Sequence, residues 1–430
     1  MNYFNLILSC WKHSHRLMKI AFVVSSFFAF VGAAPAQALD WNGKIRALWH
    51  QSDSKQSSPA FLSDLAMPLR MQTETVESEL DVKTAYFTTR ATLQGQHSSQ
   101  SDAKLKGWFN EFFVSSGDGD WQLTIGKKIL DWDVAYAFRP NDMVQQEQRR
   151  KLTQTSAIGK NMLLLDYFDA KLAASICLVE PWKSITDEKT GVSDVQMVAA
   201  RVFYQFGNVD LHGFAKYDKQ MGMSLGSSFS WVATDALELH TSLRYIDQYR
   251  YRLFNPTRVE ANAALSVTSP WQDKLGENAF QMLVGVNYTT ASHHSFILEA
   301  WWDGTARTSS QILEWSKHNQ LLQSTAVTQQ NEKLLRANLA WQNLFFSNAS
   351  SLQRRNVFAR WYSQGVNWQP AVDLIWTPDD QGRMITASLG WQGENVWVEG
   401  GIRWYGGPNR AVVAQLPTSQ IAFISSSWSF

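Results

Sequence analysis

The last nine residues of the chain, 422–430, alternate between mostly apolar and mostly small polar side chains. Counting back from the terminal Phe430, every second position carries Trp428, Ser426, Ile424 and Ala422. A period of two is the spacing of a β-strand with one apolar and one polar face. The chain therefore ends on an aromatic residue at the tip of a two-faced strand. No other stretch limits the possible folds as strongly.

The first 38 residues have the three parts of a secretory signal peptide. Basic residues precede a largely apolar run over residues 20–31, and an Ala-Gln-Ala triplet at residues 36–38 supplies a peptidase site. The apolar run of about 12 residues is well short of the roughly 20 that a membrane-spanning helix needs. We therefore predict a signal peptide over residues 1–38, with Met18 as an alternative start.

The charge and cysteine content of the mature chain exclude several classes of protein. The signal removes three basic residues and no acidic one, so 39 basic residues become 36 against 38 acidic ones, a net charge of −2. A nucleic-acid-binding surface leaves a basic footprint, so we expect no nucleic-acid partner. Cys177 is the one cysteine after residue 38, which argues against a disulfide and a cysteine-rich zinc site. We expect no metal and no cofactor.

Aromatic residues are abundant, yet the mature chain contains no helical membrane span. The sequence holds 20 Trp, 24 Phe and 12 Tyr, and no segment after the signal approaches about 18 unbroken apolar residues. Together with the period of two, this composition is typical of transmembrane β-barrels. Each strand of such a barrel carries a weak signal, and aromatic residues gather at both membrane interfaces.

Residues 39–50 show the pattern most clearly. Trp41 and Trp49 lie on one face of the expected strand, whereas Lys44 and Arg46 lie on the other. The two tryptophans are about 27 Å apart along a strand, or about 21 Å of membrane depth at a tilt of roughly 40°. The opposite register would put both cations into lipid at roughly 2–4 kcal/mol each. The register of this strand is therefore fixed.

Alternating segments recur to the end of the chain, mostly joined by short turns rich in Gly, Asn and Asp, such as residues 207–208, 378–382 and 392–395. Strands without helices between them predict an antiparallel up-and-down meander, which must close in lipid because an open edge leaves backbone groups unpaired. We count roughly 19 candidate strands, and bacterial barrels have an even number. We predict an all-β transmembrane barrel of about 18 strands, with about 16 as the alternative, forming one domain over residues 39–430.

Three segments are too long for turns, namely residues 52–78, 131–158 and 305–333. Long connections of such barrels usually lie on the extracellular side. Counting strands from a periplasmic start, however, places the second segment where a short periplasmic turn belongs. Either a preceding strand is misassigned, or this segment folds into the lumen.

The second long segment holds the densest polar cluster of the chain. A Gly-Lys strand end at residues 126–127 leads into Trp-Asp at 132–133 and Pro-Asn-Asp at 140–142. This arrangement resembles a pattern of the porin-like outer-membrane β-barrel family of Gram-negative bacteria. The resemblance implies an ordered segment folded toward the lumen beside the barrel wall. The alternative is a solvated loop whose charges select nothing.

Charged side chains that project into a water-filled pore select solutes by charge and size. Alternation places the strand residues among them inward, where they either line a path or form ion pairs across the wall. A mild basic excess favours anionic or zwitterionic solutes. The candidate pore-lining residues are Lys44, Arg46, Lys128, Asp131, Asp133, Arg139, Asp142, Arg149, Arg150, Arg201, Arg244, Asp373, Glu399 and Arg403.

Three alternatives compete with a channel. An enzyme would need a nucleophile beside a base. Residues 222–226 match G-x-S-x-G, but that motif acts at a strand-to-helix turn and a strand-like stretch follows here. His240 and Ser242 share a face about 7 Å apart, too far for a direct hydrogen bond. We expect no catalytic residues and no enzyme activity. The others are a structural barrel without an open pore and a secreted carbohydrate-binding β-sandwich, which would bury its apolar face.

The sequence thus predicts an outer-membrane channel for passive diffusion of small polar or anionic solutes. Its expected partners are outer-membrane lipid, the solutes, and the barrel-assembly machinery, reached through the final strand that ends at Phe430. No plug domain precedes the first strand, so we expect no energy-coupled transport.

Overall fold

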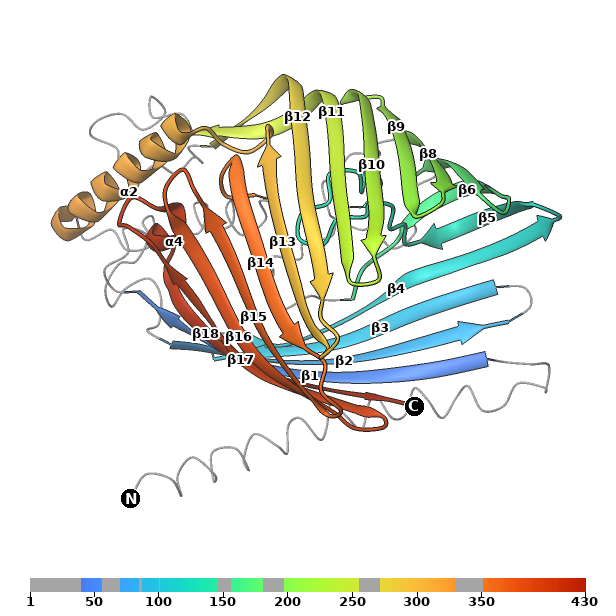
Figure 1. Ribbon diagram of the computed structural model, residues 1–430. Coiled ribbons are helices and arrows are strands. Elements are labelled where there is room, and N and C mark those ends of the chain that lie inside the picture. Colours follow the sequence, from blue (N-terminus) through green and yellow to red (C-terminus); the bar gives the residue numbers. More distant parts are fainter. Residues whose placement is uncertain are drawn as a thin grey trace.

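Eighteen strands of the described chain form one antiparallel sheet that closes on itself (Figure 1). The computed structural model describes residues 40–55, 70–84, 87–99, 101–145, 156–180, 197–254, 271–329 and 351–430. The predicted signal peptide, Arg149 and Arg150 lie outside these residues. Each strand pairs with the next in sequence, and β18 pairs with β1. The prediction of about 18 strands is confirmed, and the alternatives of 16 strands and of a β-sandwich are wrong.

The strands are β1 (Asp40–Ser54), β2 (Arg70–Lys83), β3 (Phe87–Ser98), β4 (Ser101–Asp118), β5 (Trp121–Lys128), β6 (Lys160–Phe168), β7 (Leu172–Val179), β8 (Met197–Phe206), β9 (Val209–Asp218), β10 (Gly222–Thr234), β11 (Leu237–Phe254), β12 (Trp271–Thr289), β13 (His294–Asp303), β14 (Arg355–Ser363), β15 (Trp368–Thr377), β16 (Gly382–Gln392), β17 (Val396–Gly406) and β18 (Thr418–Ser429). Two helices are described, α2 (Ser309–Gln329) and α4 (Val412–Gln415).

The seam of the barrel lies between the first and last strands. The backbone N–H of Gly43 donates to the carbonyl of Phe430 at 2.9 Å, and the Phe430 N–H donates back at 3.0 Å. The Phe430 ring packs against Trp41, with ring centroids 6.0 Å apart. It also covers Gly43, where a Cβ would lie 2.4 Å from the ring. A side chain at position 43 would therefore displace the ring that closes this end of the seam.

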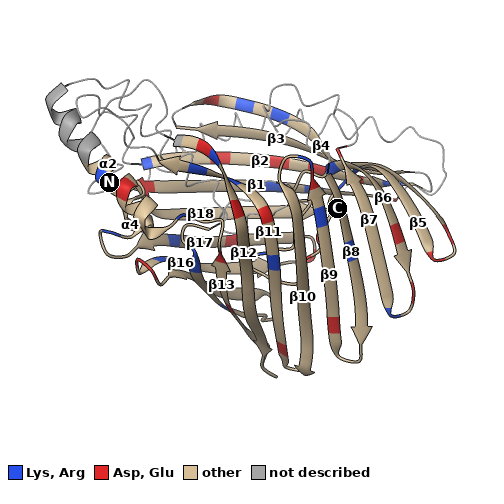
Figure 2. Cartoon of the chain, turned by 90° about the horizontal axis from the view of Figure 1, so that it is seen from above, with Lys and Arg blue, Asp and Glu red and all other residues tan. Residues whose placement is uncertain are grey.

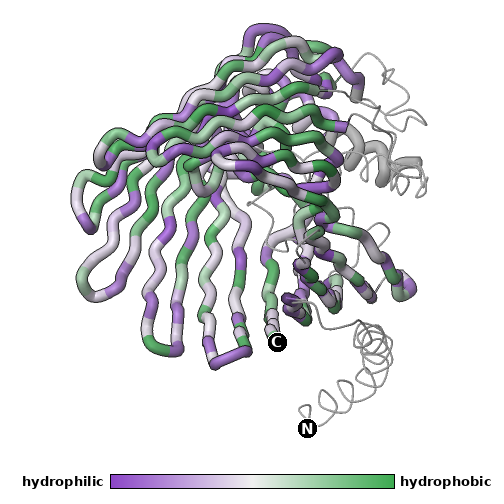
Figure 3. The backbone as a smooth tube through the Cα atoms, turned by 90° about the vertical axis from the view of Figure 1, so that its right-hand side faces the viewer, coloured by the Kyte–Doolittle hydropathy of each residue, from purple (hydrophilic) through white to green (hydrophobic). Residues whose placement is uncertain are grey.

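The outward face of the barrel is apolar. Trp41, Phe280, Leu298 and Trp428 are 45–61% exposed or close to it, and each alternates with an inward residue along its strand. Figure 3 shows this alternation of hydrophobic and hydrophilic positions along the strands. Large apolar side chains left open around a closed sheet fit contact with lipid acyl chains. Among the described helices, none is long and apolar enough to span a membrane.

The two ends of the barrel differ in the length of their connections. At one end, here called the short-turn end, hairpins such as residues 119–120, 207–208 and 235–236 join neighbouring strands. All the long connections leave the other end, here called the long-loop end. The segment after β5 follows five strands and therefore starts at the long-loop end. The strand count that placed it at the periplasmic end was wrong.

A small apolar core lies at the long-loop end. Trp315 of α2 and Val412 of α4 are fully buried there, together with Phe254 of β11 and Met384 of β16. The Asp380 carboxylate accepts the backbone N–H of Val412 at 2.9 Å, which fixes the start of α4. This core ties parts of the long connections to the strands around the mouth.

Candidate functional site: a segment docked inside the barrel

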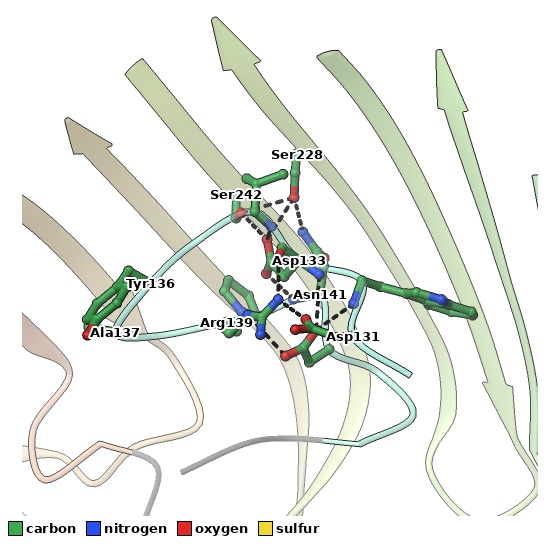
Figure 4. A network of polar contacts seen from close by, with 12 residues as sticks. Asp131, Asp133, Tyr136, Ala137, Arg139, Asn141, Ser228 and Ser242 are labelled. Atoms are coloured by element: carbon green, nitrogen blue, oxygen red, sulfur yellow. Dashed lines mark hydrogen bonds and ion pairs between the residues drawn. The ribbon is translucent and has the colours of Figure 1, made fainter. Parts of the chain in front are cut away.

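Residues 129–145, here called the inward segment, leave the end of β5 and run inside the barrel. Trp132, Phe138 and Asn141 are buried although they belong to no strand. The segment contacts β10 and β11 first and reaches β13 and β14 at its tip (Figure 4). The resemblance to porin-like barrels implied a segment folded toward the lumen, and the structure has one.

A β-bulge in β4 ties both ends of the connection to the wall. The register between β3 and β4 shifts at Asn110, so Phe109 and Phe112 both face outward while Asn110 and Glu111 both face inward. The Glu111 carboxylate accepts the N–H of Ile129 at 2.9 Å. The Asn110 amide donates to the carbonyl of Ala157 at 2.7 Å. The segment thus leaves and the connection returns at one point of the wall.

Arg139 holds the base of the inward segment together. Its guanidinium is 6% exposed and bonds the Asp131 carboxylate and the carbonyl of Asp133. Its Nε lies 3.2 Å from a carboxylate oxygen of Asp142. Asp142 also accepts the N–H groups of Trp132 at 3.1 Å and Asp133 at 3.0 Å. Burial raises the pKa of Asp142 to about 6, against the opposing effect of Arg139.

The first docking contact of the segment is the carboxylate of Asp133. It accepts the hydroxyls of Ser228 at 3.0 Å and Ser242 at 2.5 Å, which come from β10 and β11 (Figure 4). The Asn141 amide donates to the Ser228 hydroxyl at 2.9 Å. Gly226 makes room for this contact, because a Cβ there would lie 2.0 Å from the Asn141 side chain.

The second docking contact is Glu299 of β13, which has no exposed surface. Its two carboxylate oxygens accept the consecutive N–H groups of Tyr136 and Ala137, each at 2.7 Å. His240 of β11 lies 2.9 Å from the same carboxylate. A buried charge is tolerated when donors surround it. The wall therefore grips the tip of the segment by its backbone.

Apolar contacts cover the lumen side of the wall beneath the segment. The Phe138 ring stacks on Trp301 of β13 at 5.6 Å between centroids. At the base, Trp132 packs with Met162 of β6 and Phe214 of β9. These wall residues face inward yet are apolar, so simple alternation does not explain them. The inward segment explains them, because it keeps water away from this part of the lumen.

A charged wall lies on β1 to β4. Arg46 pairs with Glu77 at 3.2 Å. Arg90 pairs with Asp81 at 2.5 Å and lies 3.6 Å from Glu111. The arginine side chains are about one-third exposed, at 32% and 36%, so water reaches them. Figure 2 shows both signs of charge along these strands.

A second charged wall lies on β14 to β17. Arg360 of β14 donates to the Tyr136 hydroxyl at 2.7 Å and lies 3.4 Å from Asp373 of β15. Its guanidinium stands 5.5 Å from the ring of Tyr136 and 5.3 Å from that of Tyr362. This arginine joins the tip of the inward segment to the second wall.

The structure places the predicted residues in different settings. Arg139 and Asp142 are buried within the inward segment, as is Asp133, whereas Asp131 is exposed. Arg244 donates to the carbonyl of Pro140 at 2.8 Å and so supports the segment. The remaining predicted strand residues share the inward face but lie on several different strands: Lys44, Arg46, Lys128, Arg201, Asp373, Glu399 and Arg403.

No family model and no curated protein matches the chain. Among solved structures, it is similar to OccAB1 of Acinetobacter baumannii, with a TM-score of 0.52 and 11% identity over 93% of this chain and 98% of that one. OpdQ of Pseudomonas aeruginosa matches with a TM-score of 0.53 and 8% identity over 92% and 99% of the two chains. OccK5 (OpdH) of the same organism matches at 0.51 and 10% over 91% and 98%.

The chain has the fold of a porin-like outer-membrane β-barrel. Sequence reasoning missed two residues that matter most in this porin-like barrel, Arg360 and Glu299. The signal for Arg360 was its place between Phe358 and Tyr362 on one face of β14. Glu299 alternates with apolar inward residues, and a carboxylate in such surroundings requires donors from elsewhere in the chain.

The residues considered for an enzyme lie in other roles in the porin-like barrel. Residues 222–226 belong to β10 and continue as a strand, so the G-x-S-x-G spacing lies at no strand-to-helix turn. His240 contacts Glu299, and Ser242 donates to Asp133. Among the described residues, no group of three or more His, Cys, Asp or Glu side chains could hold a metal ion.

Proposed function

We propose that the protein is an outer-membrane channel through which small polar and anionic solutes diffuse passively. One observation carries the proposal: a segment docked inside a closed barrel covers the apolar part of the lumen and leaves two charged, water-accessible walls beside it. Fixed charges on such walls select solutes by sign and size. The similarity to outer-membrane porins in fold supports the same function.

Arg360 is the residue that we propose selects for anions. One of its terminal nitrogens, Nη1, serves both Tyr136 and Asp373. Within the described part of the chain, its Nε and Nη2 have no protein partner, and 27% of its side chain is exposed. These two nitrogens form the edge of the guanidinium that binds a carboxylate in a bidentate manner. The two tyrosine rings hold that edge in a fixed orientation.

Conductance across a planar bilayer tests the proposal. We expect discrete current steps from the purified mature protein, and a reversal potential in a potassium chloride gradient that shifts toward cations in Arg360→Gln. A unit charge 4 Å from a solute anion is worth about 1 kcal/mol in water, which changes the local anion concentration roughly fivefold.

Arg383→Gln is the matched control, because Arg383 lies opposite Trp376 on the outward face. It removes the same charge without touching the lumen. Absence of current steps would contradict the channel. Equal reversal potentials for Arg360→Gln and the original protein would reject Arg360 as the selecting residue while leaving the channel intact.

We also propose that residues 1–38 direct export and are removed, and that residues 39–430 form one barrel domain in the outer membrane. The assembly machinery would recognise the final strand that ends at Phe430. The predicted signal sequence and the outward apolar face support this placement. Cell fractionation with N-terminal sequencing should find a chain that starts at Leu39 in the outer membrane, and recovery from the soluble fraction would contradict the placement.

A further inference from the structure

Two arginines lie on the outward side of the barrel at the long-loop end. Arg355 begins β14 and stands opposite Trp302 of β13, so the two side chains share the outward face. The guanidinium carbon of Arg355 lies 5.8 Å from the centroid of the Trp302 ring, and that of Arg354 lies 5.7 Å from it. One indole thus contacts two cations, which cation–π attraction stabilises.

The height of this cluster on the barrel is set by β13. Phe296 and Leu298 are 44% and 50% exposed on the outward face, and Trp302 is the last outward residue before the strand ends at Asp303. On β12, Met282 stands beside Trp302 and is 46% exposed. The apolar belt therefore ends at Trp302. The two arginines lie where hydrocarbon gives way to lipid headgroups, the level at which tryptophans gather.

The charges in the cluster do not cancel. Arg355 lies 3.6 Å from one carboxylate oxygen of Asp379, and 65% of its side chain remains exposed. Arg354 uses its Nε to donate to the carbonyl of Ala306 at 3.1 Å. One carboxylate therefore faces two guanidinium groups. Several of their N–H groups point away from the wall at the membrane interface, where phosphate is the abundant acceptor.

We propose that Trp302, Arg354 and Arg355 form a binding site for the phosphate-bearing headgroup of a lipid in the leaflet at the long-loop end. The guanidinium groups donate to the phosphate, as arginines do in bidentate pairs. The indole holds both cations at one height and contacts the first methylene groups of the lipid. The lipid is the occupant because the apolar belt leads directly to the site, so one molecule satisfies both the belt and the cations.

Native mass spectrometry of the detergent-solubilised full barrel tests this site. The probes are lipid A with two phosphates and the same lipid after enzymatic removal of its phosphates. We expect retained adducts with the phosphorylated probe alone. The double variant Arg354→Gln/Arg355→Gln should lower adduct retention by at least about tenfold, since each basic residue at a membrane surface contributes severalfold to headgroup affinity.

Lys83→Gln/Lys171→Gln is the matched control, because both lysines are exposed at the short-turn end and the same charge is removed. Trp302→Leu keeps an apolar side chain, and we expect it to give an intermediate loss. Faster migration of unboiled protein on gels verifies that each variant is folded. Equal retention by the double variant and the control would overturn the site, as would displacement of the lipid by inorganic phosphate at low millimolar concentration. Channel conductance should be unchanged in every variant, so the outcome does not depend on the channel proposal.

Discussion

At the scale of single residues, carboxylates perform most of the docking inside the barrel. Asp133, Asp142 and Glu299 each accept at least two backbone or hydroxyl donors. Hydrogen bonds to charged acceptors are roughly twice as strong as neutral ones, so few residues suffice to fix a long segment. The same carboxylates make the dock sensitive to protonation wherever burial opposes their charge.

Asp142 predicts how acid affects the dock. Its pKa rises from an ordinary value near 3.8 to about 6 when the segment is docked. Between these values the docked state binds more protons than the free one, so docking gains stability as pH falls through 6 and loses it as pH rises. The two-unit difference corresponds to roughly 3 kcal/mol at most. Open-channel current noise should therefore decrease from pH 7 to pH 4.

Asp142→Asn should remove most of this pH dependence, because the amide keeps an acceptor for Trp132 and Asp133 but does not titrate. Asp102→Asn is the control, since Asp102 is exposed on β4 far from the inward segment in the contact pattern. Noise that rises on acidification of the original protein would refute the sign of this effect.

At the scale of elements, the bulge in β4 decides where the inward segment begins. Without the extra residue, alternation from Phe109 would send Glu111 outward into lipid and Phe112 inward. With it, Asn110 and Glu111 both hold the connection. The returning chain passes so close to the wall that Gly159 has no room for a side chain: a Cβ would lie 2.7 Å from the Lys128 backbone and 2.8 Å from the Asn110 carbonyl.

Gly159→Ala should therefore push the returning chain off the bulge. Neighbouring backbone cannot swing aside as a side chain can, and overpacking of this kind costs about 1–3 kcal/mol. We expect a lower unfolding temperature together with unstable conductance levels. Gly213→Ala provides the comparison, because it lies in β9 with open space around its added Cβ. Equal behaviour of the two variants would mean that the crossing at Gly159 does not position the segment.

At the scale of the whole molecule, closure depends on one seam between strands at opposite ends of the sequence. Phe430 contributes its ring to Trp41 across that seam and to Trp428 beside it, at 6.0 and 4.6 Å between centroids. Every other pair of neighbouring strands is consecutive in sequence, so its pairing needs a short loop closure. The seam must wait for the whole chain, and its contacts are the last to form.

Phe430→Ala should weaken the seam by about 1–2 kcal/mol, the value of two aromatic pairs. We expect the folded form to convert to the slower gel band at a lower temperature. Phe206→Ala is the control, since Phe206 is outward and 71% exposed on β8, away from the seam. Identical conversion temperatures for the two variants would exclude a special role of Phe430 in closure.

Much of the architecture follows from local pattern. The inward cations Lys44 and Arg46, the outward Trp41 and the hairpin turns are readable because a strand has a period of two and lipid excludes charge. The docked segment was indicated only through its dense polar residues. Its partners Ser228 and Glu299 lie about 90 and 160 positions further along the chain, and no local period connects such distances.

The sequence by itself determined that this chain forms a closed antiparallel barrel of about 18 strands with an apolar outer face, because that result needs only alternation, turns and the penalty for open edges in lipid. Tertiary structure alone decided which inward residues are buried and which meet water. That division depends on where the inward segment lies against the wall, and long-range carboxylate contacts and one β-bulge set its position.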